Sequence, residues 1–161
     1  MRFYKTLCLI IPLLFCGCYT FRGQTAGAIK SIAIPTLENE TAEFGLAERV
    51  TDALIRGFQR DGTLRIVNPE QADAVLRGRI IRVEDAPYTA RADQTVDEYR
   101  FSMSCALELV DSRQQETLWS QTYPAWAIYQ YSGSMEKRDL AIQEAVDKLQ
   151  QDLLNKIVGN W

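Results

Sequence analysis

Residues 99–109 read YRFSMSCALEL, and apolar side chains occupy every second position of this stretch. The apolar positions are Tyr99, Phe101, Met103, Cys105, Leu107 and Leu109, and the positions between them include Arg100, Ser102, Ser104 and Glu108. Successive side chains of a strand point to opposite faces of its sheet, so this alternation predicts a strand with one face against a core and the other in water. Cys105 falls on the apolar face, and we therefore expect it to be an inert core thiol.

Two further strands flank this stretch. Residues 74–83 and 118–128 are rich in apolar and aromatic residues that favour strands, and residues 111–116 have the composition of a hairpin turn. Pro124 interrupts the later strand, and because proline cannot donate a hydrogen bond to a neighbouring strand, we expect this strand to lie at a sheet edge or at a bulge. The acidic residues 84–97 predict a long loop.

Two segments carry apolar residues at helical spacing. In the first they are Phe44, Ala47, Val50, Thr51, Leu54 and Phe58, followed by the helix-ending pair Asp61-Gly62. In the second they are Ile142, Ala145, Val146, Leu149, Leu153 and Ile157. Recurrence at i, i+3 and i+4 predicts amphipathic helices that each bury one face.

The order of these elements predicts the fold class. Shorter strands at 29–34 and 64–67 precede the three longer strands, and one helix lies near each end of the chain. This order predicts an α+β fold in which two helices pack on one face of a mostly antiparallel sheet of four or slightly more strands, with the other face in water. We expect residues 29–161 to form this single domain.

The composition narrows the classes of function. The 161 residues contain 18 Lys and Arg against 21 Asp and Glu, a net charge of -3, so no global positive field attracts nucleic acid. Histidine is absent, which removes His-based catalysis and His-ligated metal sites. Ser134 and Lys137 match the spacing of Ser-Lys acyl enzymes, but a serine at a helix start is better explained as a cap. We expect neither an enzyme nor a bound metal or cofactor.

The first residues have the features of an export signal with a lipidation site. Residues 1–17 combine a basic start with an apolar stretch that is too short to span a membrane. Gly17 is small where a lipoprotein signal needs a small residue, and Cys18 follows it as the predicted site of lipid attachment. Residues 18–28 would then form a short tether. The alternative is cleavage by an ordinary signal peptidase, which would release a secreted soluble protein.

Arginines gather on two of the predicted strands. They are Arg77, Arg79, Arg82 and Arg100. Alternation places Arg77 and Arg79 on the same side of their strand, and guanidinium groups on an exposed sheet face can hold phosphates in a bidentate manner. These four residues are therefore candidate ligand-binding residues. The alternative is a solvated face, or ion pairs with Glu98 and Glu108.

Aromatic residues are dense in the last predicted strand and just beyond it. They are Trp119, Tyr123, Trp126, Tyr129 and Tyr131. Packing in the core and across the hairpin explains such a group, and a partner interface is the alternative, because aromatic residues are enriched at interaction hot spots.

Taken in order along the chain, short motifs resemble one known family, the lipopolysaccharide-assembly lipoproteins LptE. The resemblance covers essentially all of the chain after residue 17. The matching segments are Gly17-Cys18-Tyr19, Phe21-Arg22-Gly23, Ile32-Ala33-Ile34-Pro35, Glu38-Asn39-Glu40-Thr41, Gly45-Leu46, Thr51-Asp52-Ala53-Leu54, Asp61-Gly62, Ala72-Asp73-Ala74-Val75-Leu76, Glu98-Tyr99-Arg100, Leu118-Trp119, Ala141-Ile142 and Glu144-Ala145.

This resemblance implies a protein lipid-anchored on the periplasmic side of the outer membrane. It implies a complex with the β-barrel LptD, in which the domain acts as a plug, supports barrel assembly and takes part in lipopolysaccharide transport without catalysis or a cofactor. The competing interpretation is an accessory lipoprotein of another envelope secretion machine, such as a curli-type system. A pore former of that kind should carry a long amphipathic hairpin, and residues 84–97 look too short and too acidic for one.

Overall fold

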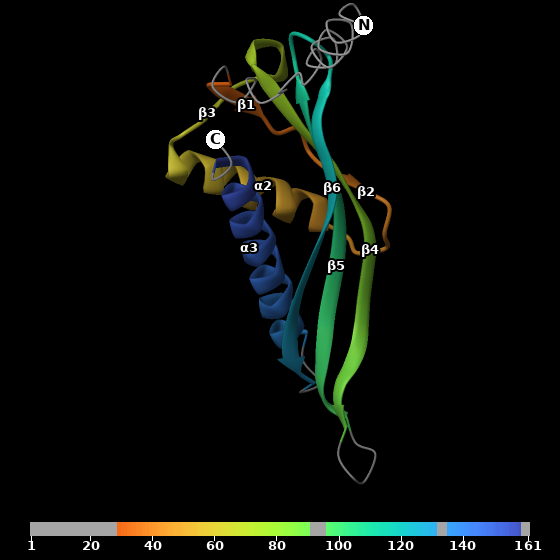
Figure 1. The fold of residues 1–161 in the computed structure, drawn as a ribbon. Helices are drawn as coiled ribbons and strands as arrows, with labels where there is room; N and C mark the ends of the chain where they lie inside the picture. The colour runs from red at the N-terminus through yellow and green to blue at the C-terminus, as the bar shows by residue number, and fades with distance from the viewer. Residues whose placement is uncertain (1–28, 91–95, 132–134, 159–161) are drawn as a thin grey trace, which may run out of the picture.

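The computed structural model describes residues 29–90, 96–131 and 135–158, which fold into one sheet and two main helices (Figure 1). The elements are β1 (Ser31–Ala33), β2 (Glu38–Asn39), α2 (Leu46–Asp61), β3 (Arg65–Ile66), the 3-10 turn η3 (Pro69–Gln71), β4 (Ala74–Ala90), β5 (Val96–Asp111), β6 (Thr117–Gln130) and α3 (Glu136–Val158). The predicted α+β class is confirmed.

Three long antiparallel strands dominate the sheet. The strand order is β3-β1-β4-β5-β6, and β2 pairs with β4 beside β1. Strands β4, β5 and β6 are antiparallel to one another, whereas the short pairings of β1 with β3 and β4, and of β2 with β4, are parallel. The sheet is therefore mostly antiparallel, as predicted, with two more strands than the minimum of four.

The inward face of β5 forms the centre of the core. Phe101, Met103, Cys105, Leu107 and Leu109 are all buried, as their alternation predicts. Burial raises the pKa of the Cys105 thiol to about 12, which keeps it protonated at neutral pH. The prediction of a core thiol is confirmed.

Helix α2 begins later than its apolar pattern suggests. The pattern from Ala47 to Phe58 is buried as predicted, but the Phe44 side chain is 99% exposed and lies before the helix. Gly45, with a left-handed φ of 73°, turns the chain between Phe44 and the first helical residue, so the predicted place of Phe44 in the buried stripe is wrong. At the other end Gly62 caps the helix in the same conformation, and its N–H donates to the Phe58 carbonyl at 3.0 Å.

Helix α3 covers the inner face of β6 and β5 and also contacts α2 (Figure 1). Its predicted apolar stripe is buried throughout. The two helices pack closely at Gly57, where a methyl group would lie 2.6 Å from the Gln150 side chain. A side chain at this position would therefore force the Gln150 side chain to move.

The predicted loop at 84–97 is wrong. Strand β4 continues to Ala90 and β5 starts at Val96, so most of this segment belongs to a long hairpin, and residues 91–95 lie outside the described structure. Pairing along the extended strands, such as Glu84 opposite Ser102, overrides the low strand propensity of the acidic residues.

Strand β6 lies at the edge of the sheet, as Pro124 predicts. It pairs only with β5 among the described strands, and Pro124 stands opposite Ser104. The ring nitrogen has no hydrogen to donate, which costs least on a strand whose second edge has no partner strand.

One charged cluster ties the β4–β5 hairpin to the helices. The Arg138 guanidinium donates to both carboxylate oxygens of Glu43, at 2.9 and 2.7 Å, and to Asp85 at 2.8 and 3.0 Å. The Tyr129 hydroxyl donates to the same Asp85 at 2.9 Å, and the guanidinium carbon lies 5.5 Å from the centre of the Phe101 ring. We call these five residues the Arg138 cluster. The hydrogen bonds to Glu43 have the largest effect on Arg138, and together with those to Asp85 they raise its pKa above its usual value.

Candidate functional site

The face of the sheet opposite the helices carries the predicted arginines. Both α2 and α3 lie on one side of the long strands, and the other side is left uncovered by the described helices (Figure 1). The side chains of Arg77, Arg79, Arg82 and Arg100 are all exposed. We call the surface formed by these four residues and their neighbours on β4 and β5 the outer face.

A β-bulge brings the third arginine to this face. Simple alternation from Arg79 would point Arg82 toward the helices. The register shifts between Ile80 and Arg82, so that Ile80 pairs with buried Cys105 and Arg82 pairs with half-exposed Ser104. The extra residue reverses the alternation, and Arg82 therefore lies on the same face as Arg77 and Arg79.

Arg100 lies on the same face at a distance from the others. It stands opposite Ala86, four residues along β5 from the partner of Arg82, which corresponds to about 13 Å at the usual strand rise. The structure thus brings Arg77, Arg79 and Arg82 into one row and places Arg100 farther along the hairpin.

Two of the four arginines form exposed ion pairs, but not with the predicted glutamates. Arg79 lies 3.3 Å from Glu40, and Arg82 lies 2.7 Å from Glu84. Pairs this exposed contribute little to stability, about 0 to 1 kcal/mol. No side-chain hydrogen bond or ion pair joins Arg77 or Arg100 to another residue in the described parts of the chain. Their guanidinium groups are therefore available to a ligand.

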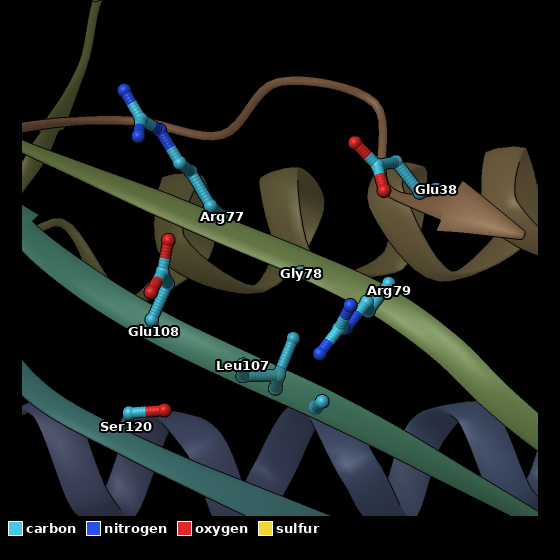
Figure 2. A pocket seen from close by; sticks show the side chains of 8 residues that line it. Glu38, Arg77, Gly78, Arg79, Leu107, Glu108 and Ser120 are labelled. Atoms are coloured by element: carbon cyan, nitrogen blue, oxygen red, sulfur yellow. The ribbon is translucent and has the colours of Figure 1, made fainter.

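A hollow of about 430 Å³ opens on the outer face around Gly78 (Figure 2). Its lining residues are Glu38, Arg77, Gly78, Arg79, Ala106, Leu107, Glu108 and Ser120. Ala106 makes this room on the outer face, because it presents only a methyl group between longer neighbours, whereas Gly78 lines the hollow with its backbone. Figure 2 shows Arg77 and Arg79 on β4, with Glu38 on one side of them and Glu108 on the other.

The sequence predicted the two arginines of this hollow as ligand-binding residues. It did not predict its two glutamates, Glu38 and Glu108, in that role. The alternation of residues 99–109 already placed Glu108 on the outer face, and this was the available signal. Glu38 precedes the long strands by many residues, and only the parallel pairing of β2 with β4, which sets Glu38 opposite Arg79, brings it to the hollow.

The aromatic residues of β6, together with Tyr131 just beyond it, divide into less exposed and more exposed members. The Trp119 and Tyr123 rings meet edge to face at 6.1 Å, and the Tyr129 ring stacks on Tyr99 at 5.9 Å. For these residues the packing interpretation is confirmed. Trp126 and Tyr131 are 47% and 68% exposed, although the Lys148 ammonium lies 4.9 Å from the centre of the Trp126 ring and the Tyr131 ring lies 5.7 Å from Tyr99. The alternative of a partner interface stays a prediction for this second pair.

Several predictions fall outside the described residues. The signal segment at 1–17, the lipidation site Cys18, the tether at 18–28 and the possible cap at Ser134 all lie there. In the parts of the chain that the structure does describe, no group of three His, Cys, Asp or Glu residues could hold a metal ion, and no helix is long and apolar enough to cross a membrane.

A family model described as lipopolysaccharide assembly, LptE, matches residues 29–157. The chain belongs to the LptE family. The match covers every described strand of the sheet, helix α2 and all but the last residue of α3. This membership assigns the chain to lipopolysaccharide assembly, and the work of the family is assembly and not catalysis. No curated protein sequence matches the chain significantly.

Solved structures similar to this LptE-family chain share its fold at low sequence identity. A Xanthomonas campestris protein has a TM-score of 0.62 at 14% identity, over 80% of this chain and 84% of that one. A minor lipoprotein from Acinetobacter baumannii scores 0.55 at 15% identity, over 82% and 92% of the two chains. A PelC dodecamer from Paraburkholderia phytofirmans scores 0.55 at 15% identity, over 80% and 88%. At these identities the likeness shows the fold alone.

Proposed function

We propose that this LptE-family protein is anchored by lipid on Cys18 to the periplasmic side of the outer membrane and forms a complex with the β-barrel LptD. Residues 1–17 would be removed as the signal, residues 18–28 would tether the chain, and residues 29–161 would form the domain that acts as a plug. In this complex the protein supports barrel assembly and takes part in lipopolysaccharide transport and insertion. The family match to residues 29–157 and the Gly17-Cys18 pair support this proposal.

The outer face is the proposed site of contact with lipopolysaccharide. The single observation that carries this part is the row of Arg77, Arg79 and Arg82 on a sheet face that the described helices leave open. Guanidinium groups bind phosphates through paired, charge-assisted hydrogen bonds, and lipopolysaccharide presents phosphates on its sugars. Arg100 extends the same charge along the hairpin. The proposal includes no catalytic step, no cofactor and no nucleic acid.

Replacing Arg77, Arg79 and Arg82 together with serine should weaken lipopolysaccharide binding about tenfold, because several charge-assisted contacts are lost at an exposed site. The fold should remain, since all three side chains are exposed. Binding of the purified full chain to immobilised lipopolysaccharide measures the affinity, and circular dichroism measures the fold. Arg56→Ser with Arg65→Ser, which removes two exposed arginines away from the hollow, is the control. Unchanged affinity in the triple variant would refute the ligand role of the outer face.

Purification of the full chain from detergent-extracted outer membranes, with an affinity tag at its C-terminus, should recover a large β-barrel protein in equal amount. Mass spectrometry of the bound material identifies the partner. Recovery of the tagged chain alone, from membranes in which the barrel is detected, would contradict the plug proposal. An exported chain with an unrelated lipoprotein signal and the same tag is the control for nonspecific capture.

The same purified protein should begin at a lipid-modified Cys18. A chain with several acyl groups on its first residue is held stably in a membrane, whereas a single acyl chain binds only marginally. Mass spectrometry of the N-terminal peptide should show the mass of the acyl groups on residue 18. Cys18→Ser should release the protein into the soluble periplasmic fraction. An unmodified Cys18 would contradict the anchor and favour the secreted form.

The alternative is an accessory lipoprotein of another envelope machine. The observation in its favour is the fold shared with PelC, which is a dodecamer in its crystal structure. This alternative predicts that the tagged chain binds lipopolysaccharide weakly, or not at all, and recovers neither LptD nor another barrel.

A further inference from the structure

The hollow around Gly78 carries both signs of charge in a fixed order. Register sets Arg77 opposite Glu108 on β5, and Glu108 in turn opposite Ser120 on β6. One step along the strands, Arg79 stands opposite Ala106 and, on its other side, opposite Glu38. The hollow is therefore lined by two arginines flanked by carboxylates, and not by a surface of uniform positive charge, although the Arg77 and Arg79 guanidinium groups point in different directions in the structure (Figure 2).

Glu108 is the half-buried acidic group of the hollow, and like the more exposed Glu38 it has no bonded cation in the described parts of the chain. It is half-buried between β4 and β6, and no hydrogen bond or ion pair joins its side chain to another described residue, although Arg77 is its register partner. Figure 2 shows the Arg77 guanidinium directed away from it. A half-buried carboxylate without a cation favours binding of one, and the Ser120 hydroxyl beside it offers a further acceptor.

The two arginines supply the complementary half. Arg77 has no bonded partner, and Arg79 uses one nitrogen on Glu40 at 3.3 Å, which leaves its other donors free. Neighbouring strands are separated by about 4.8 Å. Flexible side chains that start on neighbouring strands can therefore reach a phosphate and an ammonium group joined by a two-carbon chain.

We propose that this hollow binds a phosphoethanolamine group, with the phosphate on Arg77 and Arg79 and the ammonium on Glu108 and Ser120. The proposal rests on the proposed function, because the same arginines serve as phosphate ligands there, and it adds that the site selects a zwitterion over a bare anion. Such a group occurs as a phospholipid headgroup and as a substituent of saccharide lipids. Glu38, which is more exposed and lies beyond Arg79, reduces the positive charge without contacting the ammonium.

The test uses soluble headgroups and the full chain, labelled with nitrogen-15 and held in detergent micelles. Glycerophosphoethanolamine is compared with glycerophosphoglycerol, which has the same phosphodiester without an ammonium, and with glycerophosphocholine, whose ammonium has no N–H donor. The amide signals of Gly78 and Ala106 report binding at the hollow. We expect glycerophosphoethanolamine to bind about threefold more tightly than glycerophosphoglycerol, a difference typical of one exposed charge pair. It should also bind more tightly than glycerophosphocholine, which keeps the charge but cannot donate an N–H to Glu108.

Two matched glutamine variants separate the roles of the carboxylates. Glu108→Gln should abolish the preference for glycerophosphoethanolamine while leaving glycerophosphoglycerol bound at least as well. Glu38→Gln should strengthen both ligands alike and keep the preference. Arg77→Gln with Arg79→Gln should weaken both ligands.

The outcomes distinguish this proposal from the one on which it rests. If the wild-type chain binds both diesters equally, or if Glu108→Gln keeps the preference, the zwitterion proposal is overturned, while arginine-dependent binding of glycerophosphoglycerol still supports a phosphate site. If no headgroup shifts the Gly78 amide signal, the hollow is not a binding site, and both proposals fail at this place.

A second titration identifies the source of the group. The same amides are followed with lipopolysaccharide that carries phosphoethanolamine, with lipopolysaccharide that lacks it, and with phosphatidylethanolamine in bicelles. If the amide signals shift with one of the two phosphoethanolamine-containing lipids, and the shift requires Glu108, the proposal is supported and that lipid is the source of the group. A response independent of Glu108 for every carrier overturns it.

Discussion

Replacing Gly78 with valine should destabilise the fold by about 2 to 3 kcal/mol, the usual cost of overpacking a core. A methyl group on Gly78 would clash with the Leu107 side chain and lie 3.2 Å from Leu37. Both leucines are buried in the same cluster, so neither can swing into solvent to make room. Thermal or urea denaturation of the purified chain measures the loss.

The neighbouring residue Ala106 provides the matched control. Ala106→Val adds the same kind of side chain on the opposite face of β5, where the hollow leaves room, and it should change stability by less than about 0.5 kcal/mol. In the double variant Gly78→Val with Leu107→Ala, the new side chain fills part of the space that the leucine vacates. Its loss of stability should therefore be clearly smaller than the sum of the two single losses. Additive losses would show that Gly78 and Leu107 do not compete for the same space.

The strand that decides the fold could be interpreted from sequence because its pattern is local. The alternation of residues 99–109 has period two, and the structure buries the apolar set with Cys105 among it. The helical stripes are equally local, and they fail only at Phe44, where the left-handed Gly45 interrupts the helix geometry. A spacing rule assumes that the backbone conformation is continuous, so it cannot detect such a turn.

The candidate site was only partly accessible from sequence for a different reason. Arg77 and Arg79 share a face by simple alternation, but Arg82 joins them through a bulge, and bulges are set by pairing with a distant strand. The same dependence on distant pairing extends β4 and β5 through residues whose composition suggests a loop. Glu38 reaches the hollow by a parallel pairing that spans about 40 positions of sequence, and no local pattern announces such a contact.

The Arg138 cluster is the clearest case of structure without a local signal. Its charged members come from three separate segments of the chain: Glu43 before α2, Asp85 on β4 and Arg138 in the first turn of α3. The Arg138 side chain is only 16% exposed, and those of Glu43 and Asp85 are 24% and 28% exposed. At this burial the two carboxylates depend on the guanidinium for most of the hydrogen bonding that water would otherwise supply.

Replacing Arg138 with methionine should therefore destabilise the protein by about 2 kcal/mol, less than the cost of breaking a fully buried ion pair, because these side chains are only partly buried. Methionine keeps much of the side-chain volume and the contact with the Phe101 ring, so little of the lost stability comes from a cavity. Most of it comes from the two carboxylates that no longer have a cation. Urea denaturation at neutral pH gives the free energy of unfolding. Arg138→Lys should fall between the two proteins, because an ammonium cannot make the paired contact to both Glu43 oxygens.

Neutralising the Glu43 and Asp85 carboxylates in the Arg138→Met variant tests whether they cause its loss of stability. In the triple variant Arg138→Met, Glu43→Gln, Asp85→Asn, no carboxylate is left without its cation, and most of the lost stability should return. Lys137→Met is the control for the loss of one positive charge from the same turn of α3, and its exposed side chain predicts a change of less than about 0.5 kcal/mol. If Arg138→Met is as stable as the Lys137→Met control, the cluster is an ordinary surface ion pair. In that case the hairpin must be held to the helices by the apolar contacts of Phe101 and its neighbours alone.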